Sequence, residues 1–169
     1  MAKPTKHAAR IFFVDTHFQK MARRPGGVPR EQAIERAKNF IEELKPEFVN
    51  WLDRKLQELS AAIQQAEGSS FDPRWHDRAY RSSCQLRDVG ATMGFELVTF
   101  IANNFCEFLD LIKPGVAYDR DMINCHIDSL FLVKTEPYRN LSPEQLPEMI
   151  GGLRRVVELA SNLSARPIA

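Results

Sequence analysis

Apolar side chains recur every three or four residues along most of the chain, which is the spacing of an amphipathic α-helix. From residue 30 onward this stripe runs through two groups offset by one position: Ile34, Ala37, Ile41, Leu44 and Phe48, then Leu52, Leu56, Leu59 and Ile63. The offset is expected because 3.6 residues per turn drift against a strict seven-residue repeat. The pattern predicts a long helix that ends before GSSFDP (68–73).

Pro46 lies in the middle of this stripe. A proline inside a helix removes one backbone hydrogen bond, and its ring clashes with the carbonyl one turn earlier, here that of Glu42. Either one long helix kinks at Pro46, or a second helix begins there. The stripe continues beyond the proline, which favours the kinked helix.

Two further helices are predicted in the middle of the chain. Asp72 and Pro73 have the residue types of an N-cap and a first helical position, and their helix is expected to reach about Val89. The next helix is expected from about Met93 to KPG (113–115). Apolar residues cover more than half of its circumference, which places it near the middle of the core.

Two more helices are predicted towards the end of the chain. Either Asp119 or Asp121 caps the first of them, and its apolar positions are Ile123, Ile127, Leu130 and Phe131. Ser142, Pro143 and Gln145 form a capping box for the last helix. That helix is amphipathic, with apolar residues at Leu146, Ile150, Leu153, Val157 and Ala160.

The predicted fold class is all-α. Few stretches alternate with period two, and no Asn-Gly or Asp-Gly hairpin turn occurs. Helices with short connections pack most naturally as an antiparallel four-helix bundle, here with extra N-terminal and C-terminal helical segments. Residues 1–28 are expected to be an extension or linker, and residues 29–165 a single helical-bundle domain.

Composition excludes several classes of function. The 169 residues carry a net charge of +1, with no basic excess of the kind that nucleic-acid binders show. The basic stretch KMARRPGGVPR (20–30) is interpreted as a solvated entry segment rather than a nucleic-acid or membrane patch. No apolar run approaches the roughly 18 residues of a membrane span, and no signal-peptide core is visible. A cytoplasmic protein is expected.

The cysteines and histidines suggest no metal or cofactor. Three cysteines at wide spacing argue against a disulfide framework, and no CxxC or HxxxH pair predicts zinc. The common nucleotide-binding, hydrolase and metalloprotease motifs do not occur, so a non-enzyme is favoured. His76 is expected on a helix surface and His126 in the core or half-buried. A nucleophilic pair of His126 with Cys84 or Cys106 is a minor alternative.

The stretch RSSCQLRDVGATMGF (81–95) holds two glycines inside a predicted helix. Each costs about 1 kcal/mol relative to alanine, so both need a reason. One reason is that Gly90 and Gly94 end one helix and open the turn to the next. The other is that they keep a helix face clear for close approach by a partner.

The segment CQLRDVGATMGF (84–95) resembles the active-site segment of histidine phosphotransfer (HPt) domains, whose pattern is approximately H-x-L-K-G-x-x-x-x-x-G. The following FELVTFIANNFCEFLD (95–110) resembles the helix that packs antiparallel to the active-site helix in that family. The resemblance covers roughly residues 47–135. The matched positions are Leu86, Arg87 in place of lysine, and the final Gly94, with Gly90, Ala91 and Thr92 as the small residues between.

Two positions depart from the HPt pattern. Cys84 stands where the family has its phosphorylated histidine, and a cysteine with no activating group is mostly protonated at neutral pH. Asp88 replaces the first glycine, which adds bulk and a negative charge that opposes the carboxylates of a receiver domain. The resemblance therefore implies a phosphotransfer-like module that has lost its acceptor.

The resemblance implies a signalling protein of a two-component phosphorelay that binds a response-regulator receiver domain or a histidine kinase without carrying phosphate. The partner-binding residues would be Arg81, Cys84, Gln85, Arg87, Asp88 and Gly90. Alternatives are an active phosphotransferase that uses His76 or His126, a plain helical interaction or oligomerisation protein, and a thiol sensor at Cys84. Residues 1–28 and the last helix either cap the bundle or mediate dimerisation.

Overall fold

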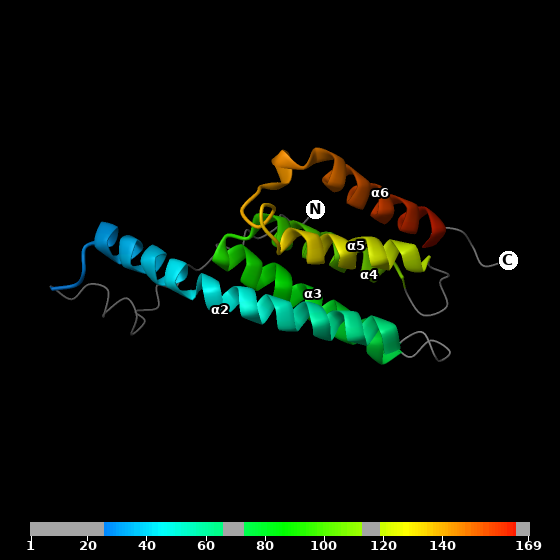
Figure 1. Ribbon diagram of the computed structural model, residues 1–169, viewed down its shortest axis with the longest axis horizontal. Helices are drawn as coiled ribbons and strands as arrows, with labels where there is room; N and C mark the ends of the chain where they lie inside the picture. Colours follow the sequence, from blue (N-terminus) through cyan, green and yellow to red (C-terminus); the bar gives the residue numbers. More distant parts are fainter. Residues whose placement is uncertain (1–25, 66–72, 113–118, 165–169) are drawn as a thin grey trace, which may run out of the picture. The chain divides into compact units, whose positions relative to one another are not determined.

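The computed structural model describes residues 26–65, 73–112 and 119–164 (Figure 1). Within these ranges every regular element is helical and no strand occurs, which confirms the all-α class. The elements are α2 (Arg30–Gln65), α3 (Pro73–Met93), α4 (Glu96–Leu111), α5 (Arg120–Val133), the 3₁₀ turn η2 (Pro143–Gln145) and α6 (Pro147–Ser164). Asp72, the predicted N-cap of α3, and most of the predicted extension lie outside the described residues.

The chain divides into two units, Met1–Asn39 and Phe40–Ala169, and the division falls inside α2. In the first unit, the described residues include the start of α2, where Ile34 is 45% exposed. In the second unit, Ile41 and Leu44 of the predicted stripe are half-buried, and its members from Phe48 to Ile63 are buried in one hydrophobic core. The functional residues considered below all lie in the second unit.

Helix α4 supplies the middle of this core, as its apolar circumference predicts. It packs against α3, α5 and α6, and its buried positions include Leu97, Ile101, Phe105, Phe108 and Leu109. Burying an aliphatic or aromatic side chain of this size stabilises the fold by about 1.5–3 kcal/mol. The arrangement of the helices as an antiparallel four-helix bundle stays a prediction.

Pro46 lies inside α2, which is one helix from Arg30 to Gln65. The alternative in which a new helix begins at Pro46 is therefore wrong. The proline is exposed, so its ring does not disturb the core-facing side, where Leu52 and Leu56 are fully buried. The packing of that side offsets the loss of one backbone hydrogen bond.

Helix α3 is longer than predicted and ends at Met93 rather than near Val89. Gly94 follows with φ +78°, a left-handed conformation that glycine adopts at little cost. The Phe95 N–H donates to the Gly90 carbonyl (2.9 Å), and the Gly94 N–H donates to the Ala91 carbonyl (3.3 Å). This pair of bonds is the Schellman motif that closes many helices. The predicted start of α4 near Met93 moves accordingly to Glu96.

The capping signals near the end of the chain are partly confirmed. Asp119 is the N-cap of α5, and its side chain accepts from the Asp121 N–H. The Ser142–Gln145 capping box forms, but it opens only the short η2 turn. If the helix continued from Pro143, the backbone N–H of residue 147 would have to donate to the Pro143 carbonyl, and Pro147 has no N–H. The chain therefore restarts, and α6 begins at Pro147.

Candidate functional site

Five of the six predicted partner-binding residues lie on one side of α3. Arg81, Gln85 and Asp88 are exposed, and Cys84 and Arg87 are half-buried. Spacings of three and four residues bring these side chains together on a helix surface. We call these five residues the α3 face. Four of them are charged or amide side chains, and the fifth is the thiol that occupies the acceptor position of the HPt pattern.

Gly90 is not part of this face, and its predicted contact with a partner is wrong. The residue is buried against α4. A Cβ placed there would lie 3.0 Å from Thr99 Oγ1 and 3.4 Å from Val98 Cγ1. The missing side chain therefore lets α4 approach α3. The second glycine, Gly94, ends the helix, as one of the two sequence interpretations proposed.

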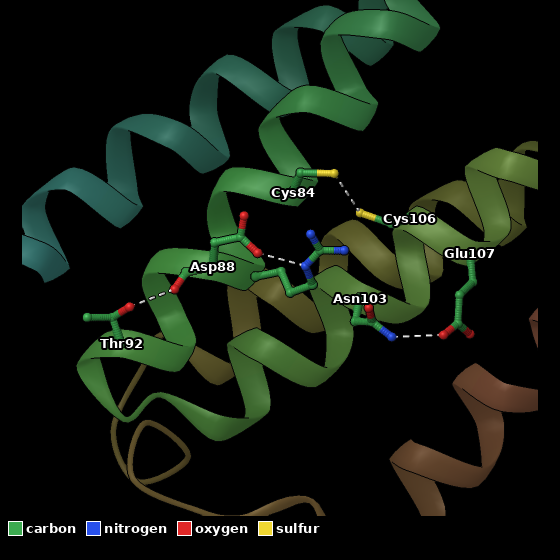
Figure 2. Close-up of polar contacts among 7 residues, drawn as sticks. Cys84, Asp88, Thr92, Asn103, Cys106 and Glu107 are labelled. Atoms are coloured by element: carbon green, nitrogen blue, oxygen red, sulfur yellow. Dashed lines mark hydrogen bonds and ion pairs between the residues drawn. The ribbon is translucent and has the colours of Figure 1, made fainter. Parts of the chain in front are cut away.

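The two charges at the centre of the face are paired. Arg87 Nε donates to Asp88 Oδ1 at 2.9 Å, and this contact is the main cause that raises the pKa of the Arg87 guanidinium. Thr92 Oγ1 donates to the Asp88 carbonyl at 3.0 Å (Figure 2). Both charged side chains remain partly exposed, so the pair adds little to stability. Its effect is to reduce the net positive charge that Arg87 presents at the surface.

Cys84 contacts a second cysteine, which the sequence did not indicate. Its Sγ lies 3.6 Å from Cys106 Sγ on α4, and the two sulfurs point toward each other (Figure 2). Cys84 is half-buried, whereas Cys106 is only 3% exposed. Burial is the largest cause that raises the pKa of Cys106 to about 12. At neutral pH this thiol is protonated.

His126 is unsuited to accept phosphate from another protein. Its side chain is fully buried and stacks on Phe105, with ring centroids 5.0 Å apart. Nδ1 lies 2.7 Å from the Met122 carbonyl, and Nε2 lies 2.9 Å from Asn104 Oδ1. Burial lowers the pKa of His126 to about 4, so the ring is neutral at pH 7. Met122 and Asn104 are the partners of the two nitrogens, so the minor alternative of a nucleophilic pair with Cys84 or Cys106 has no support.

The neutral His126 ring fixes the direction of its hydrogen bonds. A carbonyl can only accept, so Nδ1 carries the proton and donates to Met122. Nε2 then has no proton and must accept. In the structure Asn104 Oδ1 faces Nε2, so a hydrogen bond to this tautomer requires the amide group to be turned by 180° so that its nitrogen donates. The expectation of a core histidine is confirmed, because the side chain is fully buried.

The His76 side chain also forms a hydrogen bond within the protein. Its side chain is half-buried, and Nε2 donates to the Leu109 carbonyl at 2.7 Å. Leu109 lies in the last turn of α4, where backbone carbonyls have no partner in the helix itself. His76 therefore ties α3 to the end of α4. Phosphorylation at Nε2 would break this contact.

A groove lies beside the α3 face, between the end of α3, α4 and η2. It has a volume of about 520 Å³, and its lining includes Arg87, Phe100, Asn103 and Pro143. Asn103 is held by Glu107, whose carboxylate accepts from its amide at 2.8 Å. Sequence reasoning missed this groove because η2 is distant from α3 along the chain.

Cofactor and metal sites were not expected. Among the described residues, no group of three or more histidine, cysteine, aspartate or glutamate side chains is placed to hold a metal ion.

In the ranges that the structure covers, no helix combines the length and apolar character that crossing a bilayer requires.

Comparison with known proteins gave no match among protein-family models, curated proteins or solved structures.

Proposed function

We propose that this protein is a phosphotransfer-like signalling module that binds a response-regulator receiver domain through the α3 face and carries no phosphate itself. A histidine kinase is the alternative partner of the same surface. The proposal rests on the resemblance of residues 84–95 to the HPt pattern. It includes a helical bundle in which α2 from Phe40 onward, α3, α4 and α5 correspond to the four helices of that family.

One observation carries the non-catalytic part of the proposal: neither candidate histidine is available at the α3 face. His126 is fully buried, and His76 Nε2 is engaged by the Leu109 carbonyl. The position that matches the family's acceptor holds Cys84. The active phosphotransferase alternative would need one of these histidines to leave its contacts, so the geometry favours a module without an acceptor.

The charges of the face suit an acidic partner only moderately. Arg81 and Arg87 would attract the carboxylates of a receiver, whereas Asp88 opposes them and pairs with Arg87. We therefore expect a modest affinity that falls with salt, since charges at a surface are screened within about 8 Å at physiological ionic strength.

The test is a titration of the purified chain with receiver domains from the same organism. Arg81→Glu reverses an exposed charge of the face and should weaken binding about tenfold or more. Arg155→Glu makes the same charge change at an exposed position of α6 and should leave the affinity unchanged. Equal weakening by both variants, or no binding to any receiver, would remove support for the α3 face.

A plain oligomerisation protein is the second candidate, and two observations favour it. Gly90 and Gly94 both serve the chain's own packing and helix ending, so neither requires a partner. Leu159 and Leu163 are exposed on α6 by 49% and 40% and are four residues apart, hence neighbours on the helix surface. If this candidate is correct, the chain self-associates in sedimentation, and Leu159→Glu with Leu163→Glu yields a monomer.

A further inference from the structure

Two thiols from different helices are already in contact at the edge of the α3 face. Cys84 Sγ and Cys106 Sγ are 3.6 Å apart, whereas a disulfide requires about 2.05 Å. The gap is about 1.5 Å, which side-chain rotation and a small helix shift can close. The helices lie close together here because α3 presents Ala79, Ser83 and Gly90 on its buried side.

The two sulfurs differ in solvent exposure, and this difference determines which of them an oxidant reaches first. Cys84 is half-buried and reachable from solvent, and Cys106 is buried behind it. A small oxidant therefore meets Cys84 first, and Cys106 is the group positioned to react with the product.

We propose that Cys84 and Cys106 form a reversible disulfide between α3 and α4 when the protein meets a hydroperoxide. In the first step, with hydrogen peroxide as the oxidant, the Cys84 sulfur attacks one oxygen and the O–O bond breaks. The Cys84 thiol proton leaves with the other hydroxyl as water, and Cys84 becomes a sulfenic acid. In the second step the Cys106 sulfur attacks the Cys84 sulfur, the S–O bond breaks, and the Cys106 proton leaves with the hydroxyl as water. The two cysteines lose two electrons, and one hydrogen peroxide becomes two waters.

A disulfide explains this pair better than a metal does. Zinc takes four ligands, and the described residues offer no cluster of three or more metal-binding side chains. Reversible cysteine pairs in reducing compartments are usually redox-sensing or transient, and two thiols in contact suit that chemistry. The inference does not depend on the proposed receiver binding.

The test uses the full chain with Cys125→Ala, which removes the exposed third cysteine and leaves the pair as the only thiols. The protein is treated with hydrogen peroxide, alkylated, and analysed by intact mass and peptide mapping. We expect a monomer lighter by two hydrogens, a cross-link between the peptides of Cys84 and Cys106, and full recovery of both thiols with a dithiol reductant.

The single variants test the order of the steps. In the same background, Cys106→Ala should leave a sulfenic acid on Cys84 that a cyclic diketone probe captures. In the Cys84→Ala variant, Cys106 should react with hydrogen peroxide at least tenfold more slowly than Cys84 does in the Cys106→Ala variant. The proposal is overturned if peroxide leaves both thiols intact, if cross-links form only between molecules, or if Cys84 oxidises to the sulfinic acid with Cys106 still free.

Discussion

At the scale of single residues, His126 is a titratable side chain that the fold shields from water. It is buried against the rings of Phe105 and Phe108 with both nitrogens hydrogen-bonded, and its pKa is lowered from 6.5 to about 4. A charged imidazole would lose much of its hydration here. The ring therefore contributes to packing and to the link between α4 and α5, rather than to phosphate chemistry.

This lowered pKa predicts a pH dependence of stability. Below pH 6.5 the unfolded chain takes up a proton at His126, whereas the folded chain does so only near pH 4. The contribution of neutral His126 to the free energy of unfolding is fully present above pH 6.5. As the pH falls toward 4, the protein loses up to about 3 kcal/mol of this stability. Urea unfolding at several pH values measures this loss.

His126→Gln is the control for that measurement. Glutamine cannot ionise in this range, so the free energy of unfolding of the variant should fall less steeply between pH 6.5 and 4. Carboxylates contribute equally to both proteins, so the difference reports the histidine. Identical slopes for the two proteins would mean that the pKa of His126 is the same in the folded and unfolded chains.

At the scale of helices, the contact of α3 with α4 depends on Gly90. A leucine there would drive its side chain into Thr99 and Val98, and overpacking of this kind costs about 1–3 kcal/mol. Ala91, the next residue along α3, is exposed, so Ala91→Leu should lower the free energy of unfolding by less than about 0.5 kcal/mol. Denaturation midpoints of the two variants check the comparison, and equal values would contradict the close packing at Gly90.

Replacing Gly94 or Gly151 by alanine should change the stability of the protein in opposite directions. Gly94 has φ +78°, so Gly94→Ala places a Cβ in a left-handed conformation and should cost about 1 kcal/mol. Gly151 lies within α6, and a Cβ there would meet no atom within 4 Å. Gly151→Ala should therefore stabilise the protein by up to about 1 kcal/mol. Thermal unfolding measures both, and a stabilising Gly94→Ala would count against the Schellman ending.

The sequence predicted which segments are helical because local spacing and capping residues decide this. The apolar stripe from Phe48 to Ile63 and the N-cap at Asp119 are examples. The burial of Gly90 could also have been found, because Gly90 follows Leu86 by four residues and so shares its core-facing side. It lies about 200° around the helix from Asp88, which excludes it from the exposed face.

The contacts between helices could not be predicted in the same way. Whether Cys84 meets Cys106, or His76 meets the Leu109 carbonyl, depends on the axial offset and rotation of α3 against α4. Those quantities are set by the fit of both packed surfaces, and a shift of one turn would separate either pair. Single-helix periodicity carries no information on this offset.

At the scale of the molecule, the second unit combines one hydrophobic core with a polar α3 face that holds no accessible histidine. Restoring the HPt pattern should therefore restore its chemistry if the proposed function is correct. Cys84→His supplies the acceptor. Adding Asp88→Gly removes the bulk and charge that oppose a receiver and releases Arg87 from its ion pair.

The most direct measurement is transfer of labelled phosphate from receiver domains of the same organism to three proteins: wild type, Cys84→His, and Cys84→His with Asp88→Gly. We predict no acid-labile label on the wild type and label on at least one restored variant. Label on the wild type would contradict the loss of the acceptor. No label on any of the three would contradict a phosphotransfer-like face on α3.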